Sequence, residues 1–315
     1  MSSKVAIIGA GHVGATIAYT LAVNGTAAEI VMIDINEKKA FGEAMDIRQG
    51  TAYCPPTNIY SGGYADAKDA DIVIITSGIA RKAGQSRLEL SQVNTDIIKQ
   101  IAPEITKHAP NAIYVIVANP VDILTYVFCK VSGIPQNRVF GSGTLLDTAR
   151  LRSSLADYYK VSQKNVHAYV FGEHGDTSFI PWSISTISSI SVSQYHDCFF
   201  SKETAVPEIN RQDIWEYVKN SGGTIIANKG ATYYAVSIVT AMICRCIFSS
   251  VDTALTVSSM MNGEYGIEDV CLSTLSLVNN QGIKCKVPTP LTQGEMALLK
   301  KSAESLKSVI KGLKI

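Results

Sequence analysis

The sequence has no excess of charge of either sign and no long apolar run. Its 315 residues include 28 Lys and Arg and 27 Asp and Glu, which leaves a net charge of +1 at pH 7. A chain this close to neutrality has no overall field to attract nucleic acid or an anionic membrane surface. No uncharged stretch reaches the ~18 residues of a membrane-spanning helix, and the apolar run near the N-terminus is too short for a signal peptide. We therefore expect a cytoplasmic protein that binds neither nucleic acid nor membrane.

Cysteine shows no functional pattern. The seven cysteines are scattered along the chain, and none stands in a CxxC arrangement. An odd, irregularly spaced set of this kind favours neither a disulfide framework nor a structural zinc site. We expect no metal, and most of these thiols are predicted to be buried.

In the first part of the chain, short runs rich in β-branched residues alternate with helical stretches. The runs expected to be strands are residues 4–9, 29–34, 70–76, 112–117 and 138–141. They are continuously apolar rather than alternating, which is typical of strands covered by helices on both faces. The pattern predicts an α/β fold with a doubly wound parallel sheet, in which ligands bind beyond the carboxyl ends of the strands.

After residue 141 the pattern changes to a mixture of helices and strands. Helices are expected at 144–159, near 214–218, at 232–248 and at 294–311, and strands at 166–172, 184–192 and 252–261. A chain of this length favours two domains, because single hydrophobic cores stop growing near this size. We predict an N-terminal domain at 1–141 and a C-terminal mixed α+β domain at 142–315, packed closely together.

A glycine motif, GAGHVG at 9–14, follows the first predicted strand and opens a helix. In this context Gly9 permits a tight turn, Gly11 lets the backbone approach a pyrophosphate, and Gly14 allows close packing of the helix. Asp34 ends the second predicted strand, where a carboxylate accepts hydrogen bonds from ribose hydroxyls and repels a 2′-phosphate. The spacing predicts a dinucleotide site that prefers NAD to NADP. The alternatives are a plain turn and, for Asp34, a helix cap.

His174, in FGEHGD at 171–176, is a candidate general acid and base, because histidine is the side chain best matched to proton transfer near neutral pH. Asp147 and Arg150 stand three residues apart in a predicted helix and can share one face. On the residues alone, His174 could also be a surface or core histidine. The Asp147–Arg150 pair could likewise be an ordinary salt bridge.

These motifs, with RKAGQSRLEL at 81–90, NPVDILTY at 119–126 and GSGTLLDTARLR at 141–152, are similar to those of the L-lactate/malate dehydrogenase family. The resemblance runs essentially from end to end. It implies a Rossmann domain that binds NAD, and hydride transfer between nicotinamide and a small 2-hydroxy or 2-oxo acid in glycolysis and fermentation. The cofactor contacts that it implies are Gly9, Gly11, Val13, Gly14, Asp34, Lys39, Tyr64, Gly78, Val117, Asn119 and Ser142.

The resemblance also implies a role for each matching polar residue. His174 donates and accepts the substrate proton, Asp147 orients it and stabilises its imidazolium, and Arg150 binds the substrate carboxylate at two points. Arg87 polarises the carbonyl, and Asn119 hydrogen-bonds the reacting oxygen. The alternatives without the resemblance are that Arg87 is a solvated charge at the start of a helix and that Asn119 is a turn residue.

The residues leave the substrate open. Family members differ at the loop position six before the polarising arginine, usually Gln in lactate dehydrogenases and Arg in malate dehydrogenases, and here it is Arg81. An arginine closed over the methyl group of pyruvate is desolvated and unpaired, which favours a second carboxylate. By contrast, Glu173 and the implied substrate contact Thr232 resemble lactate dehydrogenases. We expect pyruvate and L-lactate, with Arg81 swung outward, and keep oxaloacetate and malate as the alternative.

Arg152 and His167 match paired basic residues that bind fructose 1,6-bisphosphate at a subunit interface in many bacterial members of the family. The resemblance therefore implies an allosterically activated homotetramer, with a homodimer as the alternative. Tyr126 and Lys130 form a YxxxK like that of short-chain dehydrogenases, which we interpret as chance because the glycine pattern differs. A non-catalytic NAD-binding protein is a further alternative. It predicts loss of a catalytic residue, whereas the three candidate polar residues are all present.

Overall fold

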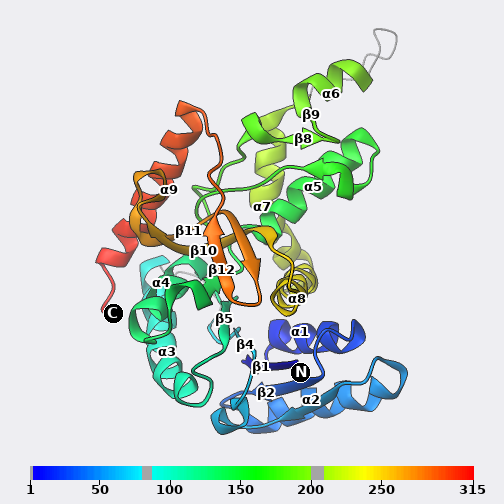
Figure 1. The fold of residues 1–315 in the computed structure, drawn as a ribbon, viewed down its shortest axis with the longest axis vertical. Helices are drawn as coiled ribbons and strands as arrows, with labels where there is room; N and C mark the ends of the chain where they lie inside the picture. Colours follow the sequence, from blue (N-terminus) through cyan, green and yellow to red (C-terminus); the bar gives the residue numbers. More distant parts are fainter. Residues whose placement is uncertain (1–2, 80–86, 200–208) are drawn as a thin grey trace.

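The structure is a computed structural model, and it describes residues 3–79, 87–199 and 209–315. The first half forms a parallel sheet with helices between its strands (Figure 1). The strands are β1 (Lys4–Ile8), β2 (Glu29–Ile33), β3 (Asn58–Ser61), β4 (Ile72–Ile75), β5 (Ile113–Ile116) and β6 (Val139–Gly141). The helices are α1 (His12–Val23), α2 (Glu37–Gly50), α3 (Arg87–His108) and α4 (Val121–Val131).

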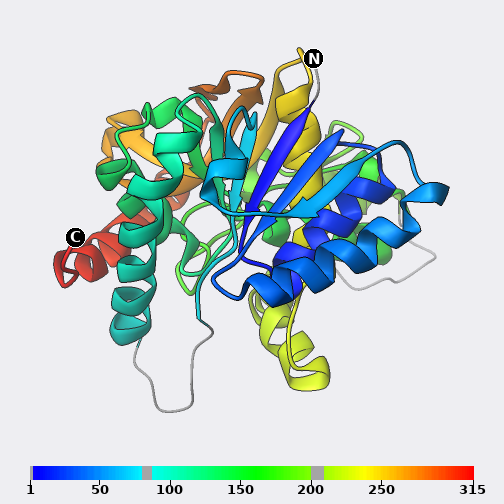
Figure 2. The same cartoon turned by 90° about the horizontal axis from the view of Figure 1, so that it is seen from below.

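These six strands lie in the order β6-β5-β4-β1-β2-β3, so the chain starts in the middle of the sheet and winds outward in both directions. This is the doubly wound arrangement that the sequence predicts, and Figure 2 shows β1 and β2 side by side with helices of the same colour beneath them. All the predicted strands of this half are present. β3 was missed because it lies at the edge of the sheet and contributes one fully buried side chain, Ile59, so it carries no continuous apolar run.

The C-terminal half continues the same sheet. Three antiparallel strands, β10 (Thr253–Asn262), β11 (Glu268–Asn279) and β12 (Gly282–Lys286), extend it beyond β6 to give nine strands within the described residues. The join is a single pairing of Gly141 with Ser258. A Cβ at Gly141 would lie 2.5 Å from Thr125 Oγ1, so glycine is required where α4 packs against the end of β6.

Several predicted segments of the second half turned out differently. The runs at 166–172 and 184–192 form only two-residue strands within the described chain, β7 (Val166–His167), β8 (Thr186–Ile187) and β9 (Ile190–Ser191). β11 and β12 were missed, because Ser273, Thr274 and Ser276 interrupt the apolar run of β11, although all three are fully buried. The predicted helices are present and one more, α6, was missed: α5 (Leu145–Tyr159), α6 (Val192–Phe199), α7 (Arg211–Lys229), α8 (Tyr234–Phe248) and α9 (Gln293–Lys311).

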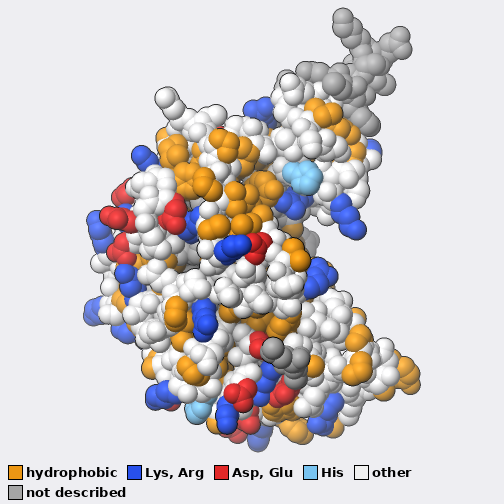
Figure 3. Space-filling view, viewed as in Figure 1, with side chains coloured by type: hydrophobic (Ala, Val, Ile, Leu, Met, Phe, Trp, Pro, Cys, Tyr) orange, Lys and Arg blue, Asp and Glu red, His pale blue; other side chains and the backbone are white. Residues whose placement is uncertain are grey.

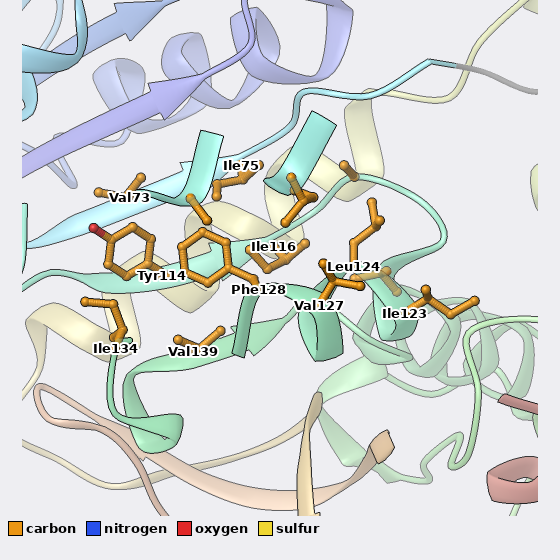
Figure 4. Packing of buried hydrophobic residues seen from close by; sticks show 14 of the residues in the cluster. Val73, Ile75, Tyr114, Ile116, Ile123, Leu124, Val127, Phe128, Ile134 and Val139 are labelled. Carbon is orange, nitrogen blue, oxygen red and sulfur yellow. The ribbon is translucent and has the colours of Figure 1, made fainter. Parts of the chain in front are cut away.

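The core beside the site is built where β4, β5 and α4 meet (Figure 4). Tyr114 of β5 packs on Phe128 of α4 with ring centroids 4.8 Å apart, and its hydroxyl donates to the carbonyl of Ala109 at 2.8 Å. Both rings are fully buried. Burying one such ring stabilises a fold by about 1.5–3 kcal/mol, so the carboxyl ends of these strands are held firmly.

The surface agrees with the charge balance of the sequence. On the face drawn in Figure 3, acidic and basic side chains are interspersed and no large area of one sign is seen. In the described part of the chain, no helix is long and apolar enough to cross a membrane.

Candidate active site

The turn between β1 and α1 is shaped by its glycines. Gly9 has φ +109°, and a Cβ there would lie 2.6 Å from Thr76 Oγ1. A Cβ at Gly14 would lie 1.9 Å from the carbonyl oxygen of Gly9, so both positions exclude a side chain. A Cβ at Gly11, by contrast, would have no atom within 4 Å. Gly11 therefore faces an open cradle at the start of α1, where the helix has no side-chain cap and backbone N–H groups can bind a phosphate.

Asp34 ties this turn to the end of β2. Its Oδ2 accepts a hydrogen bond from the backbone N–H of Ala10 at 2.6 Å, and its Oδ1 accepts one from Asn36 at 2.8 Å. The side chain that caps α2 is Asn36, which accepts from the backbone N–H of Lys39 at 3.1 Å. The helix-cap alternative for Asp34 is therefore wrong, and its carboxylate stays beside the glycine turn.

A cavity of about 430 Å³ lies beyond the carboxyl ends of the central strands. It brings the two predicted sets of residues together. From the cofactor set it is lined by Val13, Val117, Asn119 and Ser142, and from the chemical set by Asp147, Arg150, His174 and Thr232. The glycines of the turn and Asp34 do not line it themselves. The other predicted cofactor contacts outside its lining are Lys39 and Gly78, which are exposed, and Tyr64, which is half-buried.

Asp147 connects the two basic groups of the cavity. Its Oδ2 lies 2.6 Å from His174 Nδ1, and its Oδ1 accepts a hydrogen bond from an Arg150 terminal nitrogen at 2.8 Å. The side chain of Asp147 is 8% exposed and that of His174 is 25% exposed. Because Nδ1 is held by Asp147, Nε2 is the nitrogen that can meet a substrate. The salt bridge between Asp147 and Arg150 is thus one part of a larger cluster.

The electrostatics suit a proton donor. The charge of Asp147 raises the pKa of His174 above its ordinary value, outweighing burial, which lowers it. A raised pKa favours the imidazolium, which is the form that can give a proton to a carbonyl oxygen.

Asp122 holds the backbone of the loop that carries His174, and sequence reasoning did not single it out. It lies in α4, where it is 3% exposed, and its Oδ2 accepts a hydrogen bond from the backbone N–H of His174 at 2.7 Å. Its Oδ1 accepts from the hydroxyl of Ser258 at 2.6 Å. Burial raises the pKa of Asp122, and these two hydrogen bonds oppose that rise. A carboxyl within an otherwise apolar helical run, as in NPVDILTY, is the signal that could have found it.

Comparisons with known proteins agree with this geometry. The family model for the lactate/malate dehydrogenase NAD binding domain matches residues 3–141, and the model for the alpha/beta C-terminal domain matches residues 144–314. The chain belongs to the lactate/malate dehydrogenase family. The family match also gives NAD as its cofactor.

Individual relatives are similar over nearly the whole chain. It is 48% identical over 313 residues to an L-lactate dehydrogenase of Acetivibrio thermocellus, covering 99% of this chain and 98% of the relative. It is 46% identical to that of Thermoanaerobacterium saccharolyticum, over 99% and 100% of the two chains. Among solved structures, the minor L-lactate dehydrogenase from Enterococcus mundtii in a ligand-bound form superposes with a TM-score of 0.94 at 37% identity, covering 100% of this chain and 99% of that one.

The geometry at Gly11 fits the family's cofactor. A dinucleotide diphosphate needs a concave backbone without side chains, free N–H groups and a nearby carboxylate for the ribose. Gly11 with its open cradle, the uncapped start of α1 and Asp34 meet these needs.

Other predicted residues lie elsewhere or outside the described chain. Arg81 falls in the range 80–86, which the structure does not describe, and Arg87 begins α3 with a side chain outside the described part. Arg152 donates from Nε to the carbonyl of Ala168 at 3.1 Å, and burial lowers its pKa. His167 is exposed in β7, next to that carbonyl.

Tyr126 and Lys130 contact Asp269, with the Lys130 amine 2.7 Å from its Oδ1. Neither residue is among those that line the cavity. Their contacts are those of a structural ion pair, in agreement with the interpretation of the YxxxK as chance.

Proposed function

We propose that the chain is an NAD-dependent L-lactate dehydrogenase, which interconverts pyruvate and L-lactate. The observation that supports this most directly is the shared cavity, in which His174, Asp147 and Arg150 face the cofactor wall. This wall is formed by Val13, Val117, Asn119 and Ser142. The relatives named L-lactate dehydrogenase, similar over nearly the whole chain, favour pyruvate over oxaloacetate.

In this proposal His174 and Asp147 have separate tasks in the reaction. NADH, when bound, supplies the hydride that reduces the carbonyl carbon. His174 gives its Nε2 proton to the carbonyl oxygen, and takes it back when lactate is oxidised. Asp147 holds Nδ1 and stabilises the imidazolium, so the proton is placed where the alkoxide charge develops.

Arg150 is suited to hold the substrate carboxylate. A guanidinium has five N–H donors, and one terminal nitrogen of Arg150 is used on Asp147. Its other terminal nitrogen points toward α7, 3.7 Å from where a Cβ of Gly222 would stand. The absence of a side chain at Gly222 leaves room for a carboxylate in a two-point contact. Arg87 and Asn119 are proposed to polarise the carbonyl, and Thr232 to contact the substrate from the rim.

The experiment that tests the function is oxidation of NADH at neutral pH with pyruvate and, separately, with oxaloacetate. We expect kcat/KM to be at least about 10-fold higher with pyruvate, because the second carboxylate of oxaloacetate has no cationic partner when Arg81 swings outward. Higher kcat/KM with oxaloacetate would establish the malate alternative. An Arg81→Gln variant tests where Arg81 lies. If Arg81 faces the substrate, the ratio of kcat/KM for pyruvate to kcat/KM for oxaloacetate rises by about tenfold or more in this variant.

An effector site and an oligomer are proposed as well. Arg152 and His167 lie on adjoining elements, α5 and β7, and offer two basic groups for fructose 1,6-bisphosphate. Exposed apolar side chains suited to subunit contacts lie on α1, α2 and α8: Tyr19, Val23, Phe41, Met45 and Ile238. We propose a cytoplasmic homotetramer, with a homodimer as the alternative. Light scattering measures the oligomeric state. Pyruvate saturation curves with and without fructose 1,6-bisphosphate test the effector site, and superimposable curves would contradict it.

A further inference from the structure

The catalytic histidine stands on an irregular loop that other elements must hold in place. Between the bridged residues Phe171 and Phe179, His174 belongs to no helix or strand. A loop of this kind keeps its shape through the partners of its backbone N–H groups. We infer that Ser302 of α9 is a positioning residue for His174, acting through the backbone of Glu173. The inference deepens the proposed function and rests on it.

Ser302 closes a ring of hydrogen bonds with the loop. Its Oγ accepts from the backbone N–H of Glu173 at 2.7 Å and lies 3.0 Å from Thr177 Oγ1. The Thr177 hydroxyl donates its single proton to Glu173 Oε2 at 2.5 Å. The proton between Ser302 and Thr177 must therefore come from Ser302. Ser302 thus accepts from the residue before His174 and donates to the residue three after it.

The fit between α9 and the loop is close. Ser302 is fully buried, and a Cβ at Gly172 would lie 2.8 Å from its Oγ. Gly172 has φ +93° and pairs with Ser273 of β11 in an isolated bridge. Because no side chain fits between Gly172 and Ser302, the helix rests directly on the loop.

Successive N–H groups of the loop are held from different directions. The N–H of Glu173 donates to Ser302 of α9, and the N–H of His174 donates to Asp122 of α4. Two anchors on consecutive peptide groups fix the course of the backbone at His174, and hence the direction in which its ring leaves the chain. The anchor on α4 is a carboxyl group, whereas the anchor on α9 is a neutral hydroxyl, so removing Ser302 does not deprive Asp122 of its donors.

The helix that carries Ser302 is itself fixed at both ends. At its start, Glu295 accepts from the Ser183 backbone N–H at 3.0 Å and from the Ser183 hydroxyl at 2.6 Å. After its end, the backbone N–H of Lys314 donates to Gln92 Oε1 of α3 at 2.9 Å. α9 is therefore a rigid support, and displacement of the loop is expected to follow loss of the Ser302 contact rather than movement of the helix.

Loss of the Ser302 contact is expected to lower the pKa of His174. Among the groups around His174, Asp147 makes the largest contribution, and it raises the pKa of the imidazole. Asp122 raises it further and Arg150 lowers it. The other charged groups that line the cavity, Asp176 and Lys219, pair with each other at 3.1 Å. A loop that loses its anchor relaxes the contact of His174 with Asp147, so the pKa of His174 falls toward its ordinary value.

The test compares Ser302→Ala with Ser308→Ala, a serine-to-alanine change at an exposed position of the same helix. For pyruvate reduction, kcat/KM of Ser302→Ala is expected to fall about 10-fold. The alkaline limb of its pH profile is expected to move to lower pH by about half a pH unit or more. The dissociation constant of NADH, measured by fluorescence, stays within about twofold because the cofactor wall is untouched. Ser308→Ala should match the wild type in all three measurements.

A lower melting temperature with an unmoved pH limb would show a merely structural role and would overturn the inference. If Ser302→Ala does not fold, Thr177→Val removes the acceptor of the Ser302 proton and should shift the limb in the same direction. An NMR titration of the His174 ring without substrate separates the two proposals. If Ser302→Ala lowers the pKa of His174 in this titration but the wild-type protein is inactive on pyruvate, the positioning role is supported and the proposed function fails.

Discussion

The two walls of the cavity are built in different ways. The cofactor wall starts at the turn between β1 and α1, which neighbours in sequence shape: Gly9, Gly11 and Gly14 form the turn, and Val13 lines the cavity. The chemical wall depends on distant ones: the partners of the His174 loop are 27, 52 and 129 residues away along the chain. The first wall offers backbone N–H groups, and the second offers buried charges. Cofactor binding should therefore be robust to changes that abolish the chemistry.

The largest effect is expected from Asp147→Asn. The amide keeps a hydrogen bond to His174 but removes the charge that raises the pKa of the imidazole. Pyruvate reduction needs protonated His174, so its alkaline limb should move to lower pH, and kcat/KM should fall by about 10³-fold or more. NADH binding, followed by fluorescence, should change by less than about twofold. A loss of rate below about tenfold would contradict the role of Asp147.

Asp122→Ala is expected to affect both stability and rate. It leaves the Ser258 hydroxyl and the His174 N–H buried without their acceptor, which costs about 2–4 kcal/mol in the free energy of unfolding. We expect kcat/KM to fall by about 10²-fold because the histidine loop shifts. Urea unfolding and steady-state kinetics measure the two effects. The double variant with Ser258→Ala should lose less stability than the sum of the single changes, and strict additivity would show that the two residues are not coupled.

A matched pair of glycine variants sharpens the description of the cofactor wall. Gly14→Ala places a methyl group against the Gly9 carbonyl, so it should lower the free energy of unfolding by about 1–3 kcal/mol and weaken NADH binding. Gly11→Ala meets no protein atom, so it should leave stability unchanged. It should nevertheless raise the dissociation constant of NADH about 10-fold, since the methyl group occupies the cradle. Normal NADH affinity in Gly11→Ala would mean that the diphosphate binds elsewhere.

The smallest effect is expected from Lys130→Gln. Its ion pair with Asp269 is largely exposed, so the change should cost less than about 1 kcal/mol of stability. Activity on pyruvate should be unaffected, because the residue lies outside the cavity lining. A loss of activity comparable to that of Asp147→Asn would revive the YxxxK as a catalytic pair.

The contrast between the walls also explains what could be predicted from sequence. The glycine motif, Asp34 and the central strands depend on local patterns, and their positions were predicted correctly. β3, β11 and β12 were missed because an edge strand and a strand with buried Ser and Thr lack an apolar run. Asp122 and Ser302 were missed because their significance comes from contacts across the fold, with the loop that carries His174. For Asp122 the sequence holds only the weak signal of a carboxyl within an apolar helical run, and for Ser302 it holds no local signal.

The most direct test of the account is a crystal structure with NADH and oxamate, a stable isostere of pyruvate. We predict that the diphosphate lies over Gly11 and that the oxamate carboxylate makes a two-point contact with Arg150. The oxamate carbonyl oxygen should lie within hydrogen-bonding distance of His174 Nε2. Oxamate bound away from His174, or a diphosphate away from the start of α1, would contradict the claim that one cavity unites the two walls.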